Sequence, residues 1–211
     1  PSSAASDVYK RQHMKRTTMN NPNPQPPDAL FVPKLTIQLE AFDANCKPLK
    51  KVVAPAHSWL LNFYHIIKML IPQEENVSTY LKDYSGTEAQ FRAFSTSHPW
   101  DDVSNAMTQI GVGDSNTAFN ASHYKLQGSN TYWASISGAV DVPDENVSFF
   151  AEIDCISALT VKEVGIRFPK VQDVYGTNHV IMIERTVLSS SDFLDVPAGG
   201  KVKATYQLNY P

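Results

Sequence analysis

The side chains that could carry out chemistry are scattered along this 211-residue chain and form no known motif. The sequence has no GxSxG, CxxC, HExxH or GxxxxGK[ST] pattern, which are signatures of hydrolases, metal centres and nucleotide-binding loops. The histidines do not pair at a metal-ligand spacing; they are His13, His57, His65, His98, His123 and His179. We therefore predict no catalytic residue, no metal site and no cofactor, and we expect a protein that is not an enzyme.

Two groups of carboxylates remain as candidates for metal binding or hydrolysis. Asp101, Asp102 and Asp114 could supply oxygen ligands to calcium, but they lack the regular spacing of a calcium-binding loop. Glu152 and Asp154 share one face of an expected strand, where a glycosidase could use two carboxylates. A solvated outer face explains this second pair more simply, because alternate residues of a strand point to the same side. A hydrolase is the weakest functional hypothesis.

Glu163 and Arg185 are charged residues at positions where the alternation of the sequence predicts apolar ones. If their two consecutive strands pair antiparallel, the two side chains meet across them, and the guanidinium can hold the carboxylate in two bonds. In the alternative, local twist points both side chains into water. We predict a structural pair that fixes strand register, since a slip by one residue would separate the charges.

Three aromatic residues could form a sugar-stacking surface: Trp100, Tyr132 and Trp133. Tyr and Trp side chains occur both in hydrophobic cores and in binding sites. We expect at least two of these three side chains to be buried in the core. A carbohydrate-binding module is therefore kept as an alternative to a purely structural role.

The bulk composition describes an ordinary globular chain. Hydrophobic residues make up 42% of it, and the net charge of −3 gives no electrostatic reason to expect nucleic acid as a partner. No apolar run approaches the roughly 18 residues of a membrane helix, so no membrane association is expected. The two cysteines, Cys46 and Cys155, are expected to be reduced thiols, because they form no disulfide framework.

Alternating apolar and polar residues predict an all-β protein, an antiparallel β-sandwich of jelly-roll type. Turn residues such as Pro169, Gly176 and Gly199 separate the runs. The last run should be a central strand, with at least two of Tyr206, Leu208 and Tyr210 buried. The expected strands are Lys34–Asp43, Pro48–Val53, Ala106–Val112, Thr131–Val140, Asn146–Ile156, Leu159–Phe168, Val180–Leu188 and Lys201–Tyr210.

One helix is expected at about 59–71. Ser58 can cap it, and Pro72 would end it. Apolar residues cover more than half of its circumference, which predicts a mostly buried helix.

The domain organisation follows from the proline content and from the strand pattern. Residues 1–33 are expected to be a disordered or extended N-terminal arm, either a leader or a segment that lies against a neighbouring subunit. Residues 1–12 resemble translated sequencing-adapter read-through and are candidates for a non-native segment. Residues 34–211 are expected to form a single sandwich domain with an irregular insertion at about 74–106.

A series of short motifs runs from about Lys34 to the end of the chain. With a gap over Glu74–Ala106, they are His57-Ser58-Trp59, Asn62-Phe63-Tyr64, Gly111-Val112-Gly113-Asp114, Tyr124-Lys125-Leu126, Val161-Lys162-Glu163-Val164-Gly165-Ile166, Arg185-Thr186-Val187-Leu188, Val196-Pro197-Ala198-Gly199 and Tyr206-Gln207-Leu208. In their order and spacing these motifs resemble a group of tailed-bacteriophage structural proteins, which are tail-associated or virion-associated.

The resemblance implies a part of a virion and carries no catalytic motif. We expect a structural component of the tail or baseplate, or else a capsid-decorating protein, that acts by subunit packing. Its partners would be other virion proteins and further copies of itself in a symmetric oligomer. The expected location is the virion, assembled in the host cytoplasm. The alternative is a carbohydrate-binding module or a fibre-tip receptor-binding domain, whose partner would be a glycan.

Overall fold

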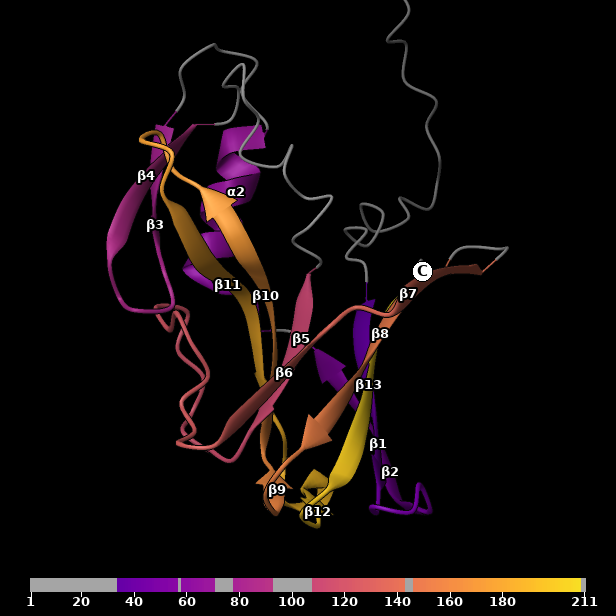
Figure 1. Cartoon of the computed structure of the whole chain (residues 1–211). Coiled ribbons are helices and arrows are strands. Elements are labelled where there is room, and N and C mark those ends of the chain that lie inside the picture. The colour runs from indigo at the N-terminus through magenta and orange to yellow at the C-terminus, as the bar shows by residue number, and fades with distance from the viewer. Residues whose placement is uncertain (1–33, 57, 71–77, 93–107, 143–145, 210–211) are drawn as a thin grey trace, which may run out of the picture. The chain divides into compact units, whose positions relative to one another are not determined.

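A computed structural model of the chain describes residues 34–56, 58–70, 78–92, 108–142 and 146–209 (Figure 1). These residues form a mostly β structure of antiparallel sheets with one short α-helix. The expected N-terminal arm lies outside the described residues. The elements are β1 (Lys34–Phe42), β2 (Pro48–Ala56), α2 (Leu61–Leu70), β3 (Ser78–Lys82), β4 (Glu88–Arg92), β5 (Gln109–Gly113), β6 (Thr131–Ser135), β7 (Gly138–Val142), β8 (Asn146–Cys155), β9 (Leu159–Val161), β10 (Glu163–Gln172), β11 (Asn178–Val187), the 3-10 turn η2 (Ser190–Asp192), β12 (Leu194–Val196) and β13 (Gly200–Asn209).

The larger sheet has the strand order β2-β1-β13-β8-β7. β13 pairs antiparallel with β1 on one side and with β8 on the other, so the predicted central position of this strand is confirmed. Tyr206 is fully buried and Leu208 is half-buried, whereas Tyr210 lies outside the described residues. The strict alternation of apolar and polar residues in β13 therefore indicates that one face of the strand packs into the core.

The second sheet has the order β11-β10-β5-β6. The single strand expected at Thr131–Val140 is wrong, because this segment is divided between the two sheets. The Ile136 N–H donates to Thr108 O beside β5, and the next N–H, of Ser137, donates to Phe150 O in β8. The chain thus crosses from one sheet to the other within two residues, which alternation alone does not reveal (Figure 1).

Two further two-stranded sheets, β12-β9 and β3-β4, correct two more expectations. The run Leu159–Phe168 is interrupted at Lys162, whose N–H donates to Gly113 O, so that β9 pairs with β12 and β10 pairs with β5 and β11. The region expected to be an irregular insertion contains the antiparallel hairpin β3–β4. Residues 93–107 of that region lie outside the described residues.

The core contains buried apolar residues from both of the larger sheets. One cluster of buried apolar residues includes Ile37 of β1, Ile153 of β8 and Val202 of β13 together with Val112 of β5 and Ile181 of β11. Burial of this kind supplies most of the free energy that folds a domain, at roughly 25 cal/mol per Å² of apolar surface.

The helix is shorter and more exposed than the sequence suggests. Ser58 does not cap it: the Ser58 carbonyl accepts the Arg185 N–H, and Leu60 N–H donates to Ile183 O, so this segment runs beside β11 as extended chain. The expectation of a mostly buried helix is wrong. Asn62 and Ile66 face the protein, whereas Leu61, Tyr64 and Ile67 are exposed on the opposite side. Only one face packs, against β3 and β11.

The hairpin turns at Asp43, Asp83 and Asp173 share one hydrogen-bond pattern. In each, a carboxylate oxygen of the aspartate accepts the backbone N–H groups two and four residues later. This geometry matches a type I turn that ends in a left-handed residue. That residue has a φ of 61° at Cys46, 94° at Gly86 and 84° at Gly176.

Candidate functional site: a buried charge network beside a surface hollow

The structure brings Glu163 and Arg185 together in the protein interior. Arg185 Nε lies 2.6 Å from Glu163 Oε2, and both side chains are 0% exposed. In the β10–β11 register Arg185 is opposite Gly165 and Glu163 is opposite Val187, so the ion pair runs diagonally across the strands. A slip of the register would break this contact and leave both charges buried, which costs several kcal/mol.

The expectation that the guanidinium holds the carboxylate in two bonds is wrong. The other two guanidinium nitrogens of Arg185 contact His123 Nδ1 at 3.1 Å and the Thr117 carbonyl at 2.9 Å. The Glu163 carboxylate accepts the N–H groups of Gln127 at 3.1 Å and Gly128 at 2.7 Å. The pair therefore holds the long connection between β5 and β6 against the sheet.

Glycines make room for the Glu163 carboxylate. A Cβ atom added to Gly113 would lie 2.6 Å from Glu163 Oε1, and one added to Gly128 would lie 3.1 Å from it. The first distance is shorter than real contacts allow. The motif residues around Gly113 are thus explained by the space that a buried carboxylate requires.

Glu163, Arg185 and the groups that hydrogen-bond to them form a buried charge network, and His123 connects this network to the protein surface. Burial and the neighbouring Arg185 lower the pKa of His123, while Glu163 opposes this shift. Because the guanidinium donates to Nδ1, the imidazole is neutral and carries its proton on Nε2. Its half-buried ring is one wall of a hollow described below.

A second buried carboxyl group links the two sheets. Glu184 of β11 accepts hydrogen bonds from the Tyr206 hydroxyl of β13 and from the Thr186 hydroxyl. Burial raises the pKa of Glu184 to about 8, against the opposing effect of the two hydroxyls and of Arg185. A carboxyl group with this pKa is mainly protonated at pH 7, which removes the cost of a second buried negative charge.

His179 connects two of the aspartate turns. Its Nδ1 lies 3.0 Å from Asp83 Oδ2 and its Nε2 lies 3.1 Å from Asp173 Oδ2. Burial lowers the pKa of His179, but the two carboxylates raise it more, so that the net shift is upward. A protonated His179 donates to both turns and fastens the hairpin β3–β4 to the hairpin β10–β11.

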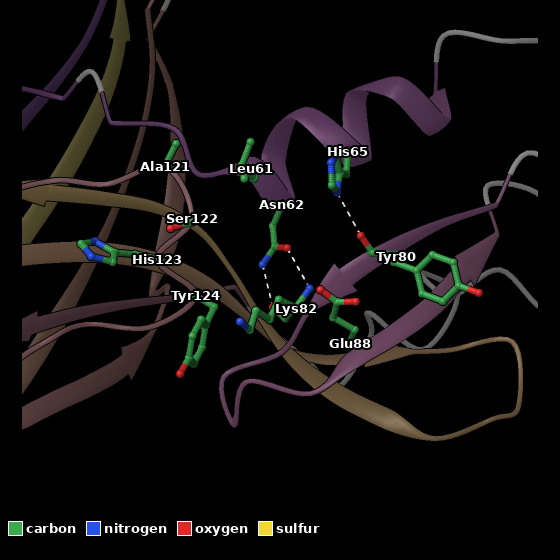
Figure 2. Close-up of a pocket in the computed structure, with 10 residues that line it drawn as sticks. All are labelled: Leu61, Asn62, His65, Tyr80, Lys82, Glu88, Ala121, Ser122, His123 and Tyr124. Carbon is green, nitrogen blue, oxygen red and sulfur yellow. Dashed lines mark hydrogen bonds between the residues drawn. The ribbon is translucent and has the colours of Figure 1, made fainter.

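A surface hollow of about 180 Å³ lies between α2, the hairpin β3–β4 and the segment 121–124 (Figure 2). Apolar, aromatic and charged side chains line it together. They belong to Leu61, Asn62, His65, Tyr80, Lys82, Glu88, Ala121, Ser122, His123 and Tyr124.

The two described residues of the proposed sugar-stacking surface, Tyr132 and Trp133, do not share a face. Trp100 lies outside the described residues. Tyr132 and Trp133 are consecutive in β6 and therefore point to opposite faces. The Tyr132 hydroxyl bonds Ser157, and the Trp133 ring packs over Gly111 with the Arg167 guanidinium 4.0 Å from its centroid.

Of the carboxylates considered for metal binding or hydrolysis, the structure describes Asp114, Glu152 and Asp154. Asp101 and Asp102 lie outside the described residues, and Asp114 bonds the side chains of Asn130 and Ser129. In the part of the chain that the structure describes, no group of histidine, cysteine and carboxylate side chains could hold a metal ion. Glu152 and Asp154 are exposed on β8, and both cysteines are free thiols.

Several residues of the network could not be found from the sequence. Thr117, Gln127 and Gly128 contribute backbone atoms, which leave no trace in residue type. For His123 the sequence suggests no role. The signal that points to the site is the pair of misplaced charges at Glu163 and Arg185.

Comparisons with protein-family models, with curated proteins and with solved structures gave no match for this chain. Among the described helices, none is long and apolar enough to cross a membrane.

Proposed function

We propose that the chain is a non-enzymatic structural component of a tailed-bacteriophage particle. The observation that supports this proposal is that the motifs resembling such proteins lie close together in the fold. Gly113, Leu126, Glu163 and Arg185 come from motifs that are far apart in the sequence. In the fold, Gly113 and Arg185 adjoin the Glu163 carboxylate, and Leu126 borders Gly165 beside them. The motifs therefore describe one three-dimensional unit.

The finer architecture that we propose is an antiparallel β-sandwich of jelly-roll type. Support comes from the two larger sheets, whose buried residues join one hydrophobic cluster, and from the crossing of the chain between them after β6. Sandwiches of this kind interleave the side chains of two inner faces in this way.

The proposed role is packing against other subunits, in the tail or baseplate first and as a capsid decoration second. The buried charges are satisfied by partners within the protein, so they need no substrate. Tyr64 and Ile67 leave an exposed apolar stripe on α2, which is the kind of surface that subunit contacts cover. The partners would be copies of this chain and other virion proteins, and the proposed location is the virion.

Mass spectrometry of purified particles tests the proposed location. Peptides of this chain should be present at the level of other structural proteins, and immunogold labelling should place them on the tail or on the capsid. Peptides found in the infected lysate but absent from purified particles would exclude a virion role.

Light scattering of the purified full chain tests the packing role. We expect an oligomer for the full chain and a lower mass for the variant Tyr64→Ser. The matched control is Tyr175→Ser, which removes an exposed tyrosine at a hairpin tip. A monomeric full chain, or equal masses for the two variants and the parent, would refute subunit packing through α2.

A further inference from the structure

The hollow beside α2 has rigid walls. The Asn62 side chain of α2 donates to the carbonyls of Lys82 and Met182, and its oxygen accepts the Lys82 N–H. These bonds use the whole amide group to fix β3 against the helix. On the other side, the Leu61 N–H donates to Ala121 O and holds the segment 121–124 in place. The hollow is therefore a preformed feature of the fold (Figure 2).

Two side chains of opposite charge border the hollow without contacting each other. Lys82 and Glu88 face each other directly in the β3–β4 register, where a lysine and a glutamate normally form an ion pair. No ion pair joins them in the described structure. The Lys82 ammonium instead lies 4.7 Å from the centroid of the Tyr124 ring. Each charged group keeps hydrogen-bonding capacity that faces the hollow.

The remaining lining residues add weaker donors and acceptors. His65 Nδ1 donates to Tyr80 O at 2.9 Å, which leaves its Nε2 as an acceptor in the neutral ring. The hydroxyls of Tyr80 and Tyr124 lie at the rim of the hollow, and among the described residues neither has a hydrogen-bond partner (Figure 2). Leu61 and Ala121 supply apolar surface between these groups.

We propose that this hollow binds one neutral sugar ring of a glycan. Lys82 and Glu88 cancel in charge, which disfavours a phosphate or an ammonium ligand and favours a neutral one. A sugar ring presents hydroxyls that both donate and accept, together with apolar C–H faces, and the lining offers the complement of each. The volume of about 180 Å³ lies below the roughly 300 Å³ at which drug-sized sites begin, so a single ring is the fitting size.

This site differs from the sugar-stacking surface expected at Trp100, Tyr132 and Trp133, and it adds a binding activity to the proposed packing role. A single small site implies weak binding, with a dissociation constant of about 1 mM. Many copies on one particle would raise the overall avidity by about 10²–10⁴ where they bind one surface together.

Saturation-transfer NMR on the full chain tests the proposal, with glucose, galactose, mannose, N-acetylglucosamine and N-acetylgalactosamine as separate probes. We expect transfer to at least one sugar and about tenfold weaker binding in Glu88→Gln and in Lys82→Met. The matched controls are Glu152→Gln and Lys203→Met, since these residues also face each other across two strands and Lys203 also lies over an aromatic ring.

Several outcomes would overturn the sugar site. They are transfer to none of the five sugars, equal binding in the hollow variants and the controls, and protein chemical-shift changes at the lining residues on adding inorganic phosphate but on adding none of the sugars. Circular dichroism with thermal melting confirms that each variant is folded. Because the oligomer is tested through Tyr64, which does not line the hollow, failure of one proposal is distinguishable from failure of the other.

Discussion

Replacing Glu184 by glutamine should remove much of the loss of stability that this fold suffers as the pH rises. The Glu184 carboxyl is fully buried and holds the Tyr206 and Thr186 hydroxyls. A glutamine has the same shape and can accept from one hydroxyl while it donates to the other. It therefore imitates the protonated carboxyl at every pH.

The size of this stability loss follows from the raised pKa of Glu184. Burial raises the pKa of Glu184 from 4.5 to about 8. Between these values the folded protein keeps a proton that the unfolded chain has lost, so the free energy of unfolding falls as the pH rises. The loss reaches about 5 kcal/mol above pH 8, because a tenfold difference in proton affinity corresponds to about 1.4 kcal/mol. Domains are typically stable by about 5–15 kcal/mol, so the effect is large.

Thermal unfolding from pH 5 to pH 9 measures this effect. The midpoint of the parent should fall by roughly 8–16 °C across the range, since about 4 kcal/mol of the loss lies between pH 5 and pH 9 and about 1 kcal/mol corresponds to 2–4 °C in a domain of this size. The variant Glu184→Gln should match the parent at pH 5 and exceed it at pH 9. Glu152→Gln is the control, because Glu152 is an exposed glutamate on β8 whose loss should leave the slope unchanged.

Parallel pH profiles for the parent and Glu184→Gln would refute the reasoning. They would mean that Glu184 is ionised in the folded protein at neutral pH, or that the hydroxyls of Tyr206 and Thr186 compensate its burial completely. A variant that is less stable than the parent at pH 5 would show that glutamine does not reproduce the two hydrogen bonds.

Further predictions concern the other polar contacts and are tested by chemical denaturation. Glu163→Gln and Arg185→Met should each cost about 3–5 kcal/mol, because each leaves a buried charge without its partner. The double variant should cost less than the sum, and additive costs would show that the two charges do not interact. His179→Gln should lower stability most at pH 6 and less as the pH rises through the raised pKa of His179, since its two charged bonds exist only while the ring is protonated. An equal loss at pH 6 and pH 9 would assign His179 a packing role only. Gly176→Ala should cost about 1 kcal/mol or more, because the residue has a φ of 84°, and no loss would mean that the turn relaxes.

The strands were largely predictable because alternation is a local property. β13 and β1 could be identified from period two alone, and the contact between Glu163 and Arg185 followed from two charges that broke the pattern. The chain crossing after β6 was missed, because the residues on both sides of it keep the same alternation while they join different sheets.

The start of the helix and the position of the hollow could not be predicted, because both are set by tertiary contacts. Residues 58–60 carry a helical capping signal, but their backbone groups pair with β11, and tertiary pairing overrides a local preference. The hollow joins residues from α2, β3, β4 and the segment 121–124, which no spacing relates. Its position depends on where the hairpin β3–β4 docks.

The central position of β13 has a consequence for biosynthesis. Its two neighbours, β1 and β8, precede it in the chain, and the sheet order leaves no contact between them until it arrives. A ribosome adds about 5–20 residues per second, so roughly 3–11 s pass between the synthesis of β8 and the completion of β13. During that interval β1 and β8 expose unpaired backbone edges that can capture another chain. The nearest chains that could pair with these edges are other nascent copies on the same messenger RNA. Slower translation initiation would increase the distance between these copies.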